Sequence, residues 1–340
     1  MAESGKKGGF APFFKQWFLE NGLKIIVSNC LTKIQEHECI AEVNMEIKAS
    51  MVKELRERTG AGMMECKKVL VDADGDIEKA IELLRTQGQV KAEKKSGRIA
   101  AEGLVIQKIS TDAKKVAMVE INCETDFVTK QNDFIEYSEH VAQFVLEKEL
   151  THIDQLMQSR YPDPNTIEMS FEDKRKTLIS KIGENIAVRR IILVKTEVKV
   201  AAYLHGVRIG VIVEYEGGDE TLGKDIAMHV AASRPLCLSQ EQVSVELIAK
   251  EKEIYIAQAQ DSGKAPEIIE KMVAGKLSKF IAEITLLGQP FVKEPDLTIE
   301  KLLQKKKAKV KQFIRFEVGE GIEKKSQNFA EEVMAQVRGS

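Results

Sequence analysis

A strand–loop–helix pattern that occurs twice in the chain constrains its fold more than any other feature. The first copy spans residues 116–145 and the second spans residues 210–233. The positions that align are Val119 and Glu120 with Val213 and Glu214, and His140, Val141 and Ala142 with His229, Val230 and Ala231. Further β-branched strands are expected within residues 185–196 and 311–322. Two related units of this kind predict two α+β subdomains side by side.

The loop is the part in which the two copies differ. The loop of the first copy is five residues longer, and its sequence NCETDFVTK, residues 122–130, places Phe127 and Val128 behind two acidic residues and a threonine. An aromatic side chain on a loop either packs into its own core or is held out for a partner. The residue types by themselves favour a buried Phe127. The elaboration of only one loop nevertheless predicts that this loop carries function.

Three short helices are predicted between residues 50 and 88, ahead of the repeat. Apolar residues recur there at the spacing of one helix face, and those expected to point inward are Val52, Leu55, Cys66, Val69, Leu70, Ala73, Ile77, Ala80, Ile81 and Leu84. Gly60 and Gly88 are placed to end helices, and Asp76 is placed to cap the start of the third one. The charged segment 91–103 is expected to be a helical or loose linker, so the three helices form a small bundle.

Inside the second subdomain the sequence predicts a helical insertion. Residues 244–260 form one helical pattern, and a turn with Gly263 leads to Pro266, which suits the start of a returning helix. The apolar residues of the returning helix are Ile269, Met272, Val273, Leu277, Phe280 and Ile281. Charged residues occupy its other faces, so we expect a two-helix hairpin, in part a coiled coil, that projects from the body. The segment GQPFVKEP, residues 288–295, closes the hairpin, because Pro290 and Pro295 permit no helix there.

Composition narrows the classes of function. The formal net charge of −2 argues against a dedicated nucleic-acid binder, which would be strongly basic. The lysine run 301–311 is interpreted as a solvated helix face, with a ribosome or RNA contact as the alternative. The five cysteines form no C-x-x-C pair, which excludes a zinc ribbon and a disulfide framework and indicates a reducing cytoplasm. No stretch approaches the roughly 18 apolar residues of a membrane span.

The N-terminal segment 1–44 has a different character. Its stretch FAPFFKQWF is rich in aromatic residues, but Lys15, Glu20 and Lys24 interrupt the apolar pattern too often for the core of a signal peptide. We expect residues 1–44 to be a non-native leader, or the result of a start codon assigned too early with Met45 as the true start. A partner-binding or membrane-surface amphipathic segment is the alternative.

The sequence contains no complete nucleotide-binding or metal-binding motif. TGAGMM, residues 59–64, lacks the Gly-Lys-Ser/Thr that lets a phosphate-binding loop hold phosphate and magnesium, and it is interpreted as a turn between helices. His205 and His229 have no metal-ligand spacing. We expect His229, on an apolar helix face, to be a core histidine. His205 precedes a strand and is a candidate for an exposed partner contact. Neither a cofactor nor a metal site is expected.

The sequence also shows no complete set of catalytic residues. Cys123 has no neighbouring base in the sequence and is expected to be buried. Glu124 and Asp126 could serve as an acid–base pair, but alternate residues of a strand-like loop point in opposite directions. A hydrolase that uses these two carboxylates and a histidine is therefore a weak hypothesis.

Blocks along the chain resemble one known family. The head contains KELRERTGAGMMECKKVL, and the blocks NCETDFV, KIGENIAVRR, HGVRIGV, AMHVAAS, GQPFV and RFEVGEGIEK follow in order. From about Met45 to the C-terminus these blocks resemble the bacterial elongation factor Ts family. RTGAGMM and TDFV are the most specific of them. Residues 1–44 lie outside the family pattern.

The resemblance implies an α+β fold with a ubiquitin-associated-like head of three helices, two repeated core subdomains, an inserted coiled-coil hairpin and a C-terminal helical module. The boundaries expected are residues 1–44 for the leader, 45–99 for the head and linker, 100–196 for the first core subdomain, 197–240 and 286–318 for the second, 241–285 for the coiled coil and 319–340 for the C-terminal module.

The family consists of cytoplasmic guanine-nucleotide exchange factors for the GTPase elongation factor Tu, which catalyse no reaction of their own and bind no membrane. The residues implied to dislodge the magnesium ion of the GTPase are Thr125, Asp126, Phe127 and Val128. Phe127 would wedge between helices of the GTPase, so the resemblance favours an exposed ring. The other implied partner contacts are Arg56, Met63, Met64 and Lys67 in the head, and His205 in the second core subdomain.

Three alternatives accompany these assignments. One of the two head methionines, but not both, is expected to face the core of the helical bundle. Arg56 could be a solvated helix charge with no partner. The whole chain could also be a binding or chaperone-like module that docks through its head and hairpin without altering any nucleotide.

Overall fold

The computed structural model describes residues 47–162, 169–260 and 265–323. Its N-terminal part is a bundle of three helices, α2 (Ala49–Thr59), α3 (Met63–Asp72) and α4 (Ile77–Lys95). Gly60 ends α2 with a φ of 67°, a backbone conformation that glycine adopts without steric cost. Asp76 caps α4 by accepting hydrogen bonds from two backbone N–H groups. The predicted inward residues are confirmed, since the core of the bundle contains Val52, Leu55, Cys66, Val69, Leu70, Ala73 and Ala80, with Ile77, Ile81 and Leu84 half-buried against it.

The end of α4 differs from the sequence prediction. Gly88 does not stop the helix, which continues to Lys95. Gly88 is buried where α4 packs along α7 (Phe171–Ile182), and a Cβ added to it would lie 3.7 Å from Ser180 Cβ. A glycine inside a helix costs about 1 kcal/mol relative to alanine. The packing of α4 against α7 offsets that cost, so the glycine here allows close approach instead of ending the helix.

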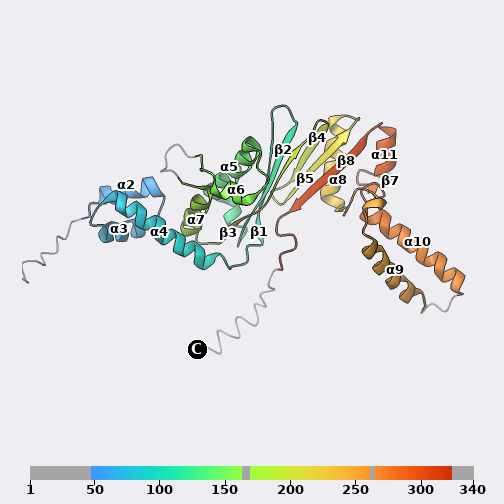
Figure 1. Ribbon diagram of the computed structural model, residues 1–340, viewed down its shortest axis with the longest axis horizontal. Coiled ribbons are helices and arrows are strands. Elements are labelled where there is room, and N and C mark those ends of the chain that lie inside the picture. The colour runs from blue at the N-terminus through green and yellow to red at the C-terminus, as the bar shows by residue number, and fades with distance from the viewer. Residues whose placement is uncertain (1–46, 163–168, 261–264, 324–340) are drawn as a thin grey trace, which may run out of the picture.

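The first core subdomain is an antiparallel sheet in the order β1 (Glu102–Ile109), β2 (Lys115–Cys123), β3 (Ile186–Lys195). Helices α5 (Asn132–Lys148), α6 (Ile153–Gln158) and α7 cover one face of this sheet (Figure 1). Its buried core includes Leu104, Val119, Ile121, Phe134, Tyr137, Val141, Phe171, Ile179 and Ile186. The apolar run of the central strand is thus buried by helices that all follow it in sequence.

The second core subdomain repeats this plan. Its sheet has the order β4 (Lys199–His205), β5 (Ile209–Glu216), β8 (Lys309–Glu317), and α8 (Glu220–Ser233) packs on it, with α11 (Ile299–Lys305) beside β8. The buried residues of this core include Val211, Val213, Tyr215, Ile226, Val230, Phe291, Ile299 and Val310.

The predicted repeat is visible in the backbone. In both sheets the central strand precedes the covering helix, and the pairing register shifts directly after a glutamate, at Glu120 in β2 and Glu214 in β5. The extra residue of each β-bulge lies on the neighbouring strand, Arg189 in β3 and Lys311 in β8, so both sheets are irregular at the same aligned position. The loop after β2 has eight residues, 124–131, whereas the loop after β5 has three, 217–219. The five extra residues predicted from the sequence are therefore confirmed.

The two sheets pack against each other through the faces that the helices leave open. This interface buries Val105, Val116, Met118, Val194, Ile212 and Phe316. The approach is close at Gly210, where an added Cβ would lie 2.6 Å from Val105 Cγ1 and 2.7 Å from Met118 Sδ. Only glycine fits there without displacing a neighbour, so the two subdomains form one continuous body.

The predicted insertion is a pair of helices, α9 (Val245–Gln260) and α10 (Pro266–Ile284), which projects from the second subdomain at the end remote from the head (Figure 1). Pro266 occupies the first turn of α10 as predicted. The expected apolar face is buried or half-buried at Ile269, Met272, Val273, Leu277, Phe280 and Ile281. After the hairpin the chain forms a small two-stranded sheet, β6 (Pro290–Phe291) and β7 (Glu294–Thr298).

The lysine run 301–311 is exposed but is not a single helix face. Helix α11 ends at Lys305, and strand β8 begins at Lys309. Two of these lysines form ion pairs, Lys306 with Asp219 and Lys311 with Glu216. The expectation of solvated lysines is confirmed, and the expectation of one helix is corrected.

Several predictions fall on parts of the chain outside the described residues. These are the segment 1–44, the turn residue Gly263, and residues 324–340 of the expected C-terminal module. Within the described residues, no helix combines the length and apolar character that crossing a membrane requires.

Candidate functional site

The long loop of the first repeat ends in a turn that presents an aromatic ring to solvent. Residues 124–131 connect β2 to α5 and include a short 3-10 helix, Val128–Lys130. The side chain of Phe127 is 73% exposed. Its neighbour is Lys130, whose Nζ atom lies 5.9 Å from the ring centroid, near the outer limit of a cation–π contact. The burial favoured by residue types alone is therefore wrong, and the exposure implied by the family resemblance is confirmed.

The residue after the ring has the opposite environment. Val128 is only 1% exposed and belongs to the core between the first sheet and its helices. The family resemblance implies that Val128 acts on the partner together with Phe127, but the side chain of Val128 is not on the surface. Because a buried side chain holds its backbone in place, Val128 anchors the turn from which Phe127 projects.

Hydrogen bonds fix the turn on its other side. The backbone N–H of Thr125 donates to Glu184 Oε2 at 2.9 Å, and its hydroxyl donates to Glu184 Oε1 at 2.7 Å. The Cys123 thiol donates to the carbonyl of Thr125 at 3.1 Å. Asp126 is exposed, and its carbonyl accepts a hydrogen bond from the Thr129 hydroxyl at 2.7 Å. The turn is thus a compact structure that leaves Asp126 and Phe127 outward.

The two carboxylates of the loop do not form a pair. Glu124 accepts a hydrogen bond from the backbone N–H of Asn185 at 2.6 Å and lies 3.6 Å from Arg98. Asp126 faces Lys130 instead, at 3.9 Å. The expectation that they point in opposite directions is confirmed, and the arrangement that a hydrolase would need is missing from this loop.

Cys123 is fully buried, as the sequence predicted. Desolvation, with a smaller contribution from Glu184, raises the pKa of this thiol to about 12. At pH 8 only about one molecule in ten thousand would then carry the reactive thiolate. We expect iodoacetamide to leave Cys123 unmodified in the folded protein and to alkylate it after unfolding. Peptide mass spectrometry measures this, and half-buried Cys237 serves as the comparison. Alkylation of Cys123 as fast as Cys237 would contradict the burial.

The head presents a second exposed apolar surface. Met63 and Met64 begin α3 and are 60% and 79% exposed, so neither side chain fills the core. The expectation that one of them faces inward is wrong, because Cys66, Val69 and Leu70 already fill the core side of α3. Arg56 on α2 and Lys67 on α3 are exposed as well. Flexible, polarizable methionines suit a surface that adapts to a partner.

His205 lies at the junction between the two subdomains. It is exposed at the end of β4, and its Nδ1 atom is 3.1 Å from the Tyr203 hydroxyl. The hairpin that follows is attached to the first subdomain, since Val207 O accepts a hydrogen bond from Val105 N at 2.8 Å. The structure thus places His205 on a fixed hairpin, consistent with a contact residue.

The remaining histidine prediction is confirmed. His229 is fully buried, and its Nε2 atom is 3.0 Å from Gln289 Oε1. Burial lowers the pKa of His229, which keeps it neutral in the core. Among the described residues, no group of three or more potential ligands is placed to hold a metal ion.

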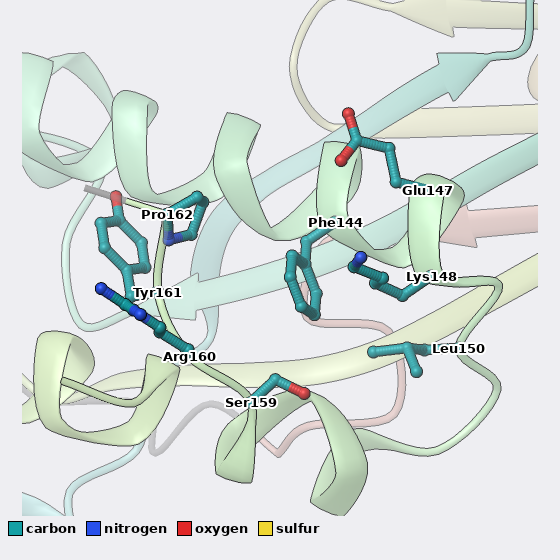
Figure 2. Close-up of a pocket in the computed structure, with 8 residues that line it drawn as sticks. All are labelled: Phe144, Glu147, Lys148, Leu150, Ser159, Arg160, Tyr161 and Pro162. Carbon is teal, nitrogen blue, oxygen red and sulfur yellow. The ribbon is translucent and has the colours of Figure 1, made fainter. Parts of the chain in front are cut away.

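A pocket of about 880 Å³ lies at the far end of α5 (Figure 2). Figure 2 shows side chains from the end of this helix on one side and from the segment that follows α6 on the other. Its lining residues are Phe144, Glu147, Lys148, Leu150, Ser159, Arg160, Tyr161 and Pro162. With a rise of about 1.5 Å per residue, the helix separates this pocket from the turn by roughly 20 Å. The pocket is therefore not part of the exposed surface around Phe127.

Two residues at the turn were not assigned a role from the sequence. Glu184 and Asn185 contact the loop that carries Phe127, although they are about 60 residues away in the chain. The block KIGENIAVRR contributed to the family resemblance, but nothing in its local pattern indicates which loop it touches. Only the pairing of β2 with β3 brings the two segments together.

Comparison with known proteins agrees with this geometry. Residues 124–320 match the family described as Elongation factor TS. Elongation factor Ts of Methylococcus capsulatus is 57% identical over 297 residues, which cover 87% of this chain and 100% of the relative. The corresponding protein of Thioalkalivibrio sulfidiphilus is 56% identical over 298 residues, again 87% of this chain and 100% of the relative. The chain therefore belongs to the elongation factor Ts family, the nucleotide exchange factors for elongation factor Tu in translation elongation.

Proposed function

We propose that the chain promotes GDP release by inserting Phe127 between helices of elongation factor Tu, while residues 125–128 displace the bound magnesium ion. The observation that carries this proposal is the 73% exposure of an aromatic ring on a turn whose base is buried and hydrogen-bonded. A large ring held in water gains free energy when a partner covers it. Val128 contributes as the anchor of the turn, and Asp126 is the exposed charge beside the ring.

Linkage explains how such a contact promotes exchange without a catalytic group. A GTPase holds GDP through backbone donors, a lysine and a bridging magnesium ion. If the factor binds the nucleotide-free GTPase more tightly than the GDP-bound form, GDP must bind less tightly when the factor is present. The chain then needs no reaction of its own, and it acts in the bacterial cytoplasm, where translation elongation takes place.

Weakening GDP binding to this extent requires more than one contact with the GTPase. A thousandfold weakening of GDP binding corresponds to about 4 kcal/mol. Covering one phenylalanine side chain supplies about 1.5–3 kcal/mol. We infer that other surfaces hold the GTPase while the ring acts. The candidates are the head residues Arg56, Met63, Met64 and Lys67, the hairpin residue His205, and the α9–α10 pair.

The domain organisation that would separate the anchoring surfaces from the turn with Phe127 is also a proposal. We propose a ubiquitin-associated-like head with its linker at residues 45–99, a first core subdomain at 100–196, and a second at 197–240 and 286–318. The α9–α10 pair would be a coiled coil at 241–285, followed by a C-terminal module from residue 319. The separate apolar core of the head and the projecting helix pair support these divisions.

The anchoring role of the head can be separated from the action of the ring. Replacing Met63 and Met64 together by serine is expected to raise the concentration of factor needed for half-maximal GDP release about tenfold, the equivalent of ~1.4 kcal/mol. The maximal release rate should stay near that of the unchanged protein, because Phe127 still reaches its site once the complex forms. Stopped-flow release of a fluorescent GDP from elongation factor Tu measures both quantities.

A matched control is Val90→Ser, which changes an exposed apolar residue on α4. This variant should show no shift in the half-maximal concentration. Equal GDP release rates with and without the unchanged protein would contradict exchange activity. They would favour the alternative of a binding module that docks without altering any nucleotide. A loss of maximal rate in the methionine variant would assign the head a direct part in nucleotide release.

A further inference from the structure

The segment that joins α7 to β3 holds the base of the loop that carries Phe127. Both oxygen atoms of Glu184 are occupied by Thr125, Oε1 by its hydroxyl and Oε2 by its backbone N–H, at 2.7 and 2.9 Å. Hydrogen bonds to an ionised carboxylate are stronger than those between neutral groups. Thr125 is two residues before Phe127, so these bonds fix the backbone directly ahead of the ring.

The next residue makes the contact reciprocal. The backbone N–H of Asn185 donates to Glu124 Oε1 at 2.6 Å, so each segment contributes a glutamate that binds the other. Asn185 is buried, and its side-chain amide donates to the carbonyl oxygens of Ser96 and Arg98 at 3.3 and 2.8 Å. These two carbonyls lie directly after α4, at the point where the head is joined to the core.

The rest of the loop is constrained from inside the subdomain. The thiol of Cys123 donates a hydrogen bond to the Thr125 carbonyl. Val128, the residue after Phe127, is buried in the core. Phe127 is therefore held between a buried anchor that follows it and a hydrogen-bonded anchor that precedes it. An exposed loop of eight residues would otherwise sample many backbone conformations, and ordering it during binding would weaken the complex.

We infer that Glu184 is a positioning residue for nucleotide exchange, which pre-orders the turn so that Phe127 is presented in its working orientation before elongation factor Tu binds. This inference rests on the proposed action of Phe127. Glu184 acts through Thr125. Asn185 supports the same turn and connects it to the end of the head helix α4.

Stopped-flow release of fluorescent GDP from elongation factor Tu, at saturating factor, tests the inference through a double-variant cycle. Glu184→Ala is expected to lower the maximal release rate about tenfold. Glu184→Gln, which keeps one acceptor for Thr125, should lose less. Thr125→Val removes the hydroxyl but keeps the N–H donor, and it should also lose an intermediate amount. In a Phe127→Ala background, Glu184→Ala should have almost no further effect, because a positioning residue acts only through the group that it positions.

The control is Glu197→Ala, which removes a carboxylate bound to Lys114 at 2.7 Å at the opposite end of the same sheet. It should leave the release rate unchanged. Thermal unfolding followed by circular dichroism confirms that each variant is folded, and the Gln and Val variants keep the test open if Glu184→Ala does not fold.

Two results would overturn the inference while leaving the proposed function intact. One is a wild-type maximal rate for Glu184→Ala when Phe127→Ala is slow. The other is a tenfold loss from Glu184→Ala that persists in full in the Phe127→Ala background, which would indicate a general structural role. A wild-type rate for Phe127→Ala would instead refute the proposed function, and this inference with it.

Discussion

Replacing Phe127 by alanine is expected to slow the GDP release that this protein promotes from elongation factor Tu by about 10–100-fold. The ring is exposed in the free protein, and the proposed complex would cover it. Losing the burial of one phenylalanine removes about 1.5–3 kcal/mol, and every 1.4 kcal/mol is a factor of ten. Stopped-flow release of fluorescent GDP at saturating factor measures the change. The fold should be unaffected, because the side chain makes few contacts within its own chain.

The control for this variant is Ile109→Ala. Ile109 is also exposed and apolar, but it ends β1 at the edge of the sheet opposite the turn. It should exchange nucleotide like the unchanged protein. If Phe127→Ala released GDP as fast as Ile109→Ala and the unchanged protein, the exposed ring would not be the group that releases GDP. If both were slowed equally, exposed apolar area in general, and not the turn, would be responsible.

The largest expected effect on stability belongs to Glu120→Gln. This carboxylate is fully buried, and it accepts hydrogen bonds from Arg189 at 3.0 Å, Arg190 at 2.5 Å and the backbone N–H of Gly319 at 2.9 Å. Removing one partner of a buried ion pair leaves the charge of the other partner uncompensated, which costs about 3–5 kcal/mol. The arginines also bind Glu320, so we expect a loss of about 3 kcal/mol.

The repeat supplies a matched comparison. Glu214 occupies the aligned position of the second subdomain and is also buried, but its side chain accepts a hydrogen bond from the neutral amide of Gln312 at 2.9 Å. Exchanging it for glutamine should cost only about 1 kcal/mol. Urea unfolding measures both losses, and hydrogen exchange of the β2 and β5 amides assigns each loss to its subdomain. Equal losses at the two sites would show that the ion pairs of Glu120 add nothing.

Much of the architecture could be predicted from local patterns. The apolar residues of the head recur at the spacing of one helix face, and the structure buries them together. The strand–loop–helix repeat corresponds to two sheets in which the pairing register of the central strand shifts after the same aligned glutamate. Each of these signals is contained within one helix or one strand–loop–helix copy, where periodicity reports which face is buried.

The local pattern gave a wrong prediction where the environment of a residue depends on neighbours that are distant in sequence. Gly88 has the local signature of a helix end, but α7 packs against it and the helix continues. Met63 and Met64 were expected to divide between core and surface, but other side chains of α3 already fill the core. The lysine run has one composition but two backbone conformations, because from Lys309 on it belongs to β8, the strand that pairs with β5.

The sequence by itself determined the helical head, the doubled subdomain, the projecting helix pair and, through the resemblance of its blocks, the family. Local periodicity and specific motifs carry this information, and neither depends on how distant segments meet. The resemblance already implied an exposed Phe127, but the tertiary structure alone decided that Val128 points inward beside it, and that Glu184 and Asn185 hold the turn. Adjacent apolar residues on a loop look alike in sequence, and only the pairing of β2 with β3 brings in the carboxylate that orients them.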